Sequence, residues 1–315
     1  MGKKNRAKAR TAASGSTAPS EVGPRQPCPC GSGRRYKACH GAPGGGTVFV
    51  KRPFEGLAAE CDLVALRELV PAATAELPLR GEYADRAVRL CTLLPMAAPA
   101  MVRESGEVWL GLQVQHNFGD PSRDLAAVLL AALDAEPGTP MVGLTEPPGE
   151  GPRLQDLVTD TSLDITVHDG FGYWVADAED REAAEALIEQ ANEAITPTSR
   201  LTSVEAAYWT DVGSKEHLRW VMPEPEDTLL DALSRLHAAG QDTLVDGSRL
   251  VGMFRAHGLL APVWDLEVGT GAEALEEPAA RFAKDLADAL ADTSDLTTEQ
   301  RAARSGLANR QVTIR

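Results

Sequence analysis

Four residues of the types that bind metal ions lie within thirteen positions near the start of the chain, and no other feature restricts the possible structure as strongly. They are Cys28, Cys30, Cys39 and His40, with the spacing C-x-C-x8-C-H. A segment this short cannot bury a hydrophobic core, so a bound metal must supply its folding free energy. Three thiolates and one imidazole form a known tetrahedral set for Zn²⁺. The sequence therefore predicts a structural zinc site whose four positions are all filled by protein, with none open to activate water.

The residues between these ligands suit such a site. The Gly-Ser-Gly stretch at 31–33 tolerates the tight turn that lets backbone approach the thiolates. Three thiolates and Zn²⁺ sum to one negative charge, which Arg34, Arg35 and Lys37 would offset. Tyr36 is the only large side chain in the loop, and we expect it to pack over the site. We take the three basic residues and Tyr36 as candidates for contact with a partner. The alternative for the cysteines is reduced thiols without a metal.

Residues 28–41 read Cys-Pro-Cys-Gly-Ser-Gly, two basic residues, Tyr-Lys-Ala and then Cys-His-Gly, and they resemble the SEC-C motif. This motif is the zinc-binding tail at the C-terminus of the preprotein translocase ATPase SecA. The resemblance implies that Cys28, Cys30, Cys39 and His40 are the ligands. It also implies contacts of the kind that the SecA tail makes with the export chaperone SecB and the ribosome. It covers only about residues 24–43, and no G-x-x-x-x-G-K-[ST] phosphate loop follows, so a translocase motor is not predicted.

The rest of the chain is similar to a family of uncharacterised actinobacterial proteins that carry this motif near the N-terminus. The similarity rests on the stretches Arg-Pro-Phe-Glu-Gly-Leu at 52–57, Leu-Arg-Glu-Leu-Val-Pro-Ala at 66–72, Phe-Arg-Ala-His-Gly-Leu at 254–259 and Asn-Arg-Gln-Val at 309–312. It implies a body of unknown function and no particular activity.

Charge separates the beginning of the chain from the remainder. Residues 1–52 hold 11 Lys and Arg against one acid, whereas residues 53–315 hold 20 Lys and Arg against 45 acids. We expect a disordered basic tail at 1–23, the zinc motif at 24–43, a Gly-rich linker at 44–46 and an acidic domain at 47–315. The tail is interpreted as a solvated arm, as an electrostatic contact to RNA, a ribosome or an acidic protein, or as a segment that rests on its own acidic body.

Strand and helix patterns recur along the acidic body. They predict four strand–strand–helix units, with strands at 99–103 and 107–115, 163–168 and 171–176, 206–211 and 217–222, and 249–256 and 259–266, and helices from 120, at 179–195, 225–239 and 278–291. We therefore expect an α+β fold, an antiparallel sheet covered by helices, preceded by a small zinc-binding knuckle. Each hairpin has one tryptophan in its second strand, and these side chains either anchor the core or line a shared groove.

The end of the chain is expected to hold a short capped helix at 297–304, followed by residues 308–315 as an edge strand or a free tail.

No catalytic group stands out in the body. None of its histidines, His116, His168, His217, His237 and His257, has a recognised ligand spacing. His168 and His257 fall at expected turns, where exposed polar residues are ordinary. Cys91 lies in an apolar run and is expected to be a buried small hydrophobe, and Cys61 has no basic neighbour that the sequence can place.

These observations predict a zinc-binding adaptor or docking protein in the cytoplasm, with structural Zn²⁺ as its cofactor. Its partner would be a protein, or the ribosome or RNA, reached through the basic N-terminal segment. No run of about 18 apolar residues is present, so a membrane-spanning helix is not expected. No small-molecule substrate can be identified. The alternative is an enzyme of unrecognised type in residues 47–315 that the zinc module recruits.

Overall fold

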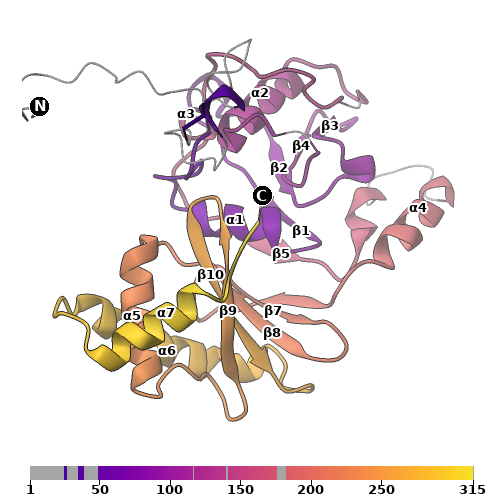
Figure 1. Cartoon of the computed structure of the whole chain (residues 1–315). Helices are drawn as coiled ribbons and strands as arrows, with labels where there is room; N and C mark the ends of the chain where they lie inside the picture. Colours follow the sequence, from indigo (N-terminus) through magenta and orange to yellow (C-terminus); the bar gives the residue numbers. More distant parts are fainter. Residues whose placement is uncertain are drawn as a thin grey trace, which may run out of the picture. The chain divides into compact units, whose positions relative to one another are not determined.

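The computed structural model describes residues 25–26, 35–38, 49–115, 117–139, 141–175 and 182–314. The chain divides into two units, residues 1–48 and 49–315. In the first, the described part holds one short 3₁₀ helix, η1, at Tyr36–Ala38. The second is an α+β unit with two mixed sheets, which confirms the predicted fold class (Figure 1).

The first sheet has the strand order β3-β4-β2-β1-β5, and we call it sheet one. Its strands are β1 Ala73–Glu76, β2 Val88–Cys91, β3 Ala100–Val102, β4 Val108–Gly111 and β5 Ile165–Val167. The β3–β4 pair is the predicted antiparallel hairpin, but β2 and β4 run parallel. The associated helices are α1 Glu60–Glu68, η2 Gly81–Tyr83, η3 Pro95–Ala97, α2 Pro121–Leu133, α3 Leu154–Leu157, η4 Phe171–Val175 and α4 Glu182–Asn192.

Alternation along the strands of sheet one gives it two buried faces. Val108 and Leu110 of β4 pack in the cluster that contains α1 and α2, whereas Trp109 between them packs beside Cys91 and Tyr173. This is the period of two that a strand imposes on its side chains. Sheet one therefore separates the larger core from a smaller aromatic cluster around η4.

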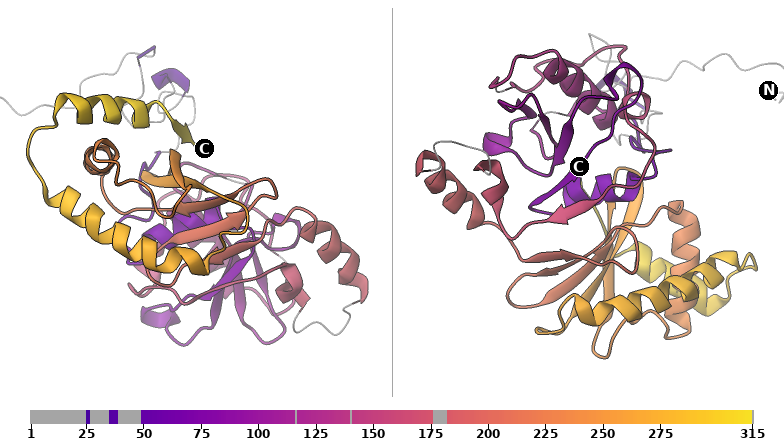
Figure 2. Two further views of the ribbon diagram at one scale, coloured as in Figure 1. Left: turned by 90° about the horizontal axis from the view of Figure 1, so that it is seen from below. Right: turned by 180° about the vertical axis from the view of Figure 1, so that it is seen from behind.

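The second sheet, sheet two, has the order β11-β9-β10-β8-β7-β6. Its strands are β6 Thr198–Arg200, β7 Ala207–Asp211, β8 Glu216–Trp220, β9 Arg249–Ala256, β10 Leu259–Leu266 and β11 Gln311–Thr313. The β7–β8 and β9–β10 hairpins match the prediction. The helices that follow are α5 Glu226–Ala238, η5 Glu273–Leu275, α6 Glu276–Ala291 and α7 Thr298–Ala308. Figure 2 shows these helices gathered beside sheet two, where their apolar faces close a second core.

The predicted hairpin at 163–176 is wrong. β5 pairs instead with β1, and residues Phe171–Val175 form a 3₁₀ helix. The spacing of three between Phe171 and Trp174 stacks their rings at a centroid distance of 4.4 Å in this helix. Both rings thereby enter the aromatic cluster, which a strand with alternating side chains would not allow.

The tryptophans anchor the core. Trp109, Trp174, Trp220 and Trp264 are 3%, 5%, 7% and 0% exposed. Such burial supports the interpretation as core residues and leaves no groove lined by these rings. Trp174 lies in η4 rather than in a strand, so the regular placement expected from the sequence holds for the other three.

The N-terminal caps of α7 and α2 can be compared with the caps expected from the sequence. Thr297 caps α7 in a capping box: its hydroxyl accepts from Gln300 N at 3.2 Å, and the Gln300 side chain accepts from Thr297 N at 2.9 Å. Asp120, expected to cap α2, makes no side-chain cap hydrogen bond. Its carboxylate pairs instead with Arg153, at 3.0 Å from Nε to Oδ2. After α7, β11 joins β9 as a parallel edge strand.

None of the helices in the described residues is long and apolar enough to cross a membrane.

Candidate functional site

The described part of the motif segment shows one closing contact. The backbone N–H of Tyr36 donates to the carbonyl of Gln26 at 2.8 Å, which joins the two ends of the loop between them. The helix η1 then leads directly to Cys39 along the chain. The predicted ligands Cys28, Cys30, Cys39 and His40 lie outside the described residues, as does Arg34.

The closure suits the predicted donor set. Gln26 lies two residues before Cys28, and Tyr36 lies three residues before Cys39. Each predicted ligand pair therefore begins within three residues of one of the two joined positions. Of the candidate contact residues, Arg35 and Lys37 are exposed and Tyr36 is half-buried. Two of the basic groups next to the motif are therefore accessible to a partner. No group of three His, Cys, Asp or Glu able to hold a metal occurs within the described ranges, which do not include the four predicted ligands.

In the second unit, His257 joins the β9–β10 turn to helix α1. Its Nε2 lies 2.7 Å from Glu68 Oε1, and its ring packs 5.9 Å from the ring of Phe54. The expectation of an ordinary exposed turn residue is wrong, because the side chain is only 15% exposed. His257 also has a φ of 47°, in the left-handed region that disfavours residues other than Gly and Asn. The packing around the ring and the ion pair hold it there.

The contact with His257 changes the pKa of Glu68. Burial alone would raise the pKa of the Glu68 carboxyl, but the hydrogen bond and charge of His257, with the charge of Arg67, outweigh burial and lower it. A carboxyl whose pKa is lower in the folded chain stabilises the fold above its unfolded pKa of about 4.3. That contribution is lost as the pH falls through the folded value.

We expect His257→Asn to remove this pH-dependent contribution. Asn tolerates the left-handed backbone but brings no positive charge. The variant should lose about 1–3 kcal/mol of unfolding free energy at pH 6, and its stability should fall less steeply between pH 5 and pH 3 than that of the wild type. Urea unfolding at several pH values measures both effects. Glu68→Gln should flatten the same limb, and additive losses in the double variant would show that the two side chains are not coupled.

A second buried polar contact joins α1 to sheet two. Asp62 accepts from the Tyr208 hydroxyl at 2.9 Å and from Arg200 Nη2 at 3.1 Å. Asp62 and Tyr208 are 6% and 1% exposed. Burial and the neighbouring carboxylate raise the pKa of Tyr208, so its hydroxyl remains a donor. The cluster is satisfied internally, which indicates a structural role rather than catalysis.

The two thiols of this unit, those of Cys61 and Cys91, are poorly placed to act as nucleophiles. Burial raises the pKa of both Cys61 and Cys91 to about 12, so at neutral pH they carry almost no thiolate. Cys91 is 0% exposed, which confirms the prediction of a buried small hydrophobe.

His168 does not form a catalytic pair. Its Nε2 lies 2.8 Å from the Thr74 hydroxyl, and its ring packs 4.8 Å from the ring of Tyr173. Thr74 is 5% exposed in β1. A substrate could not reach that hydroxyl, so the histidine and the threonine do not act as base and nucleophile.

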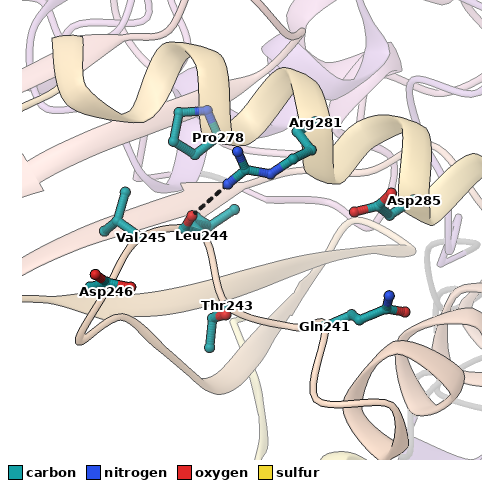
Figure 3. A pocket seen from close by; sticks show the side chains of 8 residues that line it. All are labelled: Gln241, Thr243, Leu244, Val245, Asp246, Pro278, Arg281 and Asp285. Atoms are coloured by element: carbon teal, nitrogen blue, oxygen red, sulfur yellow. Dashed lines mark hydrogen bonds between the residues drawn. The ribbon is translucent and has the colours of Figure 1, made fainter.

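A shallow pocket of about 490 Å³ lies between residues 241–246 and α6 (Figure 3). Arg281 reaches across it and donates from Nη2 to the carbonyl of Leu244 at 3.3 Å. Its lining also contains the Thr243 hydroxyl and the carboxylates of Asp246 and Asp285, with no cysteine, serine or histidine. The pocket therefore offers one hydroxyl and two carboxylates beside an arginine, a polar set without a thiol or an imidazole.

Comparison with known proteins gives two matches to protein families. The model of a family of unknown function, DUF5926, matches residues 53–315, and that of the SEC-C motif matches residues 25–42. No curated protein and no solved structure matches the chain.

Proposed function

Because the chain belongs to the DUF5926 family of unknown function and carries a SEC-C motif ahead of that region, we propose that it is a zinc-dependent docking protein. A small zinc module at residues 24–43 would contact a protein partner, or the ribosome or RNA. Cys28, Cys30, Cys39 and His40 would hold the ion. The zinc would be structural, since four protein ligands fill a tetrahedral site.

The observation that carries the proposal is the backbone closure between Tyr36 and Gln26. The two ligand pairs begin two and three residues beyond the joined positions, so the loop supports their approach to one centre. Bound zinc supplies the folding free energy that a segment without a core lacks. The cysteines must stay reduced to bind it, which fits a role in the cytoplasm.

Exposed positive charge next to the module supports a docking role. Arg35 and Lys37 are exposed, and the tail before them adds further Lys and Arg. The remainder of the chain is strongly acidic, so attraction to phosphate or to acidic protein surface would come from this segment. No described residue cluster in the second unit supports catalysis, and we favour docking over an enzyme on that ground.

Metal analysis tests the zinc site directly. Chain prepared without oxygen should contain about one zinc ion, and Cys39→Ser should lose nearly all of it, because three remaining ligands hold zinc far more weakly. Cys61→Ala removes a cysteine outside the motif and should keep the metal. Wild-type chain without zinc, or Cys39→Ser chain with full zinc content, would contradict the site.

Capture from cell extract tests docking. The full chain should retain a partner that a chain lacking residues 1–43 does not, and Cys39→Ser should lose it as well. The double variant Arg35→Gln, Lys37→Gln should weaken capture and reduce its salt dependence. Nuclease treatment separates RNA from protein partners. Equal capture by the full and shortened chains would contradict docking through this module.

A further inference from the structure

The face of sheet two opposite the one that α5 and α6 cover carries a group of basic side chains. Leu218 and Trp220 of β8 pack in the core that α5 and α6 close, so His217 and Arg219 project from the opposite face. The strand register adds neighbours to that face. Asp265 of β10 lies opposite His217, and Arg249 of β9 lies opposite Asp265. Lys215, just before β8, reaches the same carboxylate.

A single carboxylate, that of Asp265, lies beside Lys215, His217 and Arg249. Asp265 pairs with Lys215, lies 3.1 Å from His217 Nδ1 through Oδ1, and lies 3.8 Å from Arg249 Nη2 through Oδ2. Lys215, Arg219 and Arg249 carry three positive charges against the single carboxylate of Asp265, an excess of two. The excess stands out because residues 53–315 as a whole are strongly acidic.

Arg219 is the least compensated member of the group. The residue is half-buried, and its Nε is buried without a hydrogen-bond partner in the part of the chain that the structure describes. Burial lowers the pKa of Arg219, and no neighbouring carboxylate raises it again. A charged donor atom that is buried without a partner costs folding free energy, so an anion bound at Arg219 would stabilise this side chain.

We propose that this face binds a small phosphate-bearing ligand, with Arg219 as the anchor and His217, Lys215 and Arg249 around it. A guanidinium offers paired N–H donors that match the oxygens of a phosphate. A phosphomonoester carries close to two negative charges at neutral pH, which equals the local excess.

The size of the accessible surface favours a small ligand over a polymer. The side chains of Lys215 and Arg249 are 51% and 73% exposed, but that of His217 is only 18% exposed and Arg219 is half-buried. An extended nucleic acid needs a row of accessible cations and stacking aromatics. Tyr208, the aromatic side chain beside Arg219 in the register, is buried and donates to Asp62.

Calorimetric titration of the full chain with inorganic phosphate, at constant ionic strength and against chloride, tests the site. Saturable binding to the wild type is expected, and Arg219→Gln should weaken it about tenfold or more, as the loss of a charged hydrogen bond implies. The matched control Arg86→Gln removes the same charge from an exposed arginine and should bind phosphate within about twofold of the wild type. No binding to the wild type, or equal weakening by both variants, overturns the proposal.

Two further measurements separate the proposal from its competitors. Without phosphate, Arg219→Gln should be at least as stable as the wild type, because an uncompensated cation has been removed. Clear destabilisation would show a structural role for Arg219 and overturn the assignment. Acetate or a short single-stranded oligonucleotide should bind more weakly than phosphate through Arg219. Tighter binding of either would assign the face to a carboxylate or to nucleic acid instead.

Discussion

Replacing Asp62 by Ala is expected to destabilise the unit formed by residues 49–315 by about 3 kcal/mol or more, because it removes one partner of a buried ion pair. The Arg200 guanidinium and the Tyr208 hydroxyl would both lose their acceptor. The side chain of Arg200 is 24% exposed, so water would compensate it in part, and the lower end of the usual range of 3–5 kcal/mol applies. Tyr208 is 1% exposed and would gain little from solvent.

Urea unfolding followed by circular dichroism measures this loss, with Asp85→Ala as the control. Asp85 is exposed, and its replacement should change the unfolding free energy by less than about 0.5 kcal/mol. Asp62→Asn keeps an acceptor for the tyrosine and should lie between Asp62→Ala and the wild type. A loss below about 1 kcal/mol for Asp62→Ala would show that the contact between α1 and sheet two contributes little.

Elements with strong local patterns could be predicted from the sequence. The β9–β10 hairpin alternates apolar residues around a His-Gly turn, and both of its strands have the bounds that the pattern predicts. Helix α5 and the β7–β8 hairpin were likewise predictable from their local apolar patterns. In each case the signal and the contact partner lie within a few residues of one another.

Elements that depend on distant partners could not be predicted. β1 has four residues and pairs with β2 and with β5, which lies some ninety residues further along the chain. Its sequence Ala-Thr-Ala-Glu carries no strong strand signal. Residues 163–176 do carry one, yet burial of Phe171 and Trp174 in the aromatic cluster outweighs it. Tertiary packing decides such short segments.

The same limit applies to the functional residues. The proposed zinc ligands can be picked out because all four lie within thirteen positions and their chemical types are specific. Asp62 and Arg200 are 138 residues apart, and His257 and Glu68 are 189 apart, so no spacing in the sequence relates them. The uncompensated charge of Arg219 likewise depends on which carboxylates the fold brings near it.

Replacing Trp264 by Ala should destabilise the unit formed by residues 49–315 by about 3–5 kcal/mol, as removal of a large core aromatic usually does. Trp264 is 0% exposed, its ring packs edge-on to Phe282 at 5.2 Å, and its Nε1 donates to the carbonyl of Asp242 at 2.8 Å. The substitution would leave a cavity in the core beneath α6 and deprive that carbonyl of its donor. Trp264→Phe keeps most of the volume and should lose about half as much.

Trp264→Ala and Cys39→Ser should separate the stabilities of the two units. Because residues 1–48 and 49–315 are distinct units, Trp264→Ala should lower the unfolding free energy of the second and leave the zinc content unchanged. Cys39→Ser should remove the zinc and leave the urea transition of the second unit in place. Val268→Ala, at a position 62% exposed, is the control for surface substitution. A loss below about 2 kcal/mol for Trp264→Ala would show that the core beside sheet two adapts around the missing ring. Loss of zinc in the same variant would show that the motif depends on the fold that follows it.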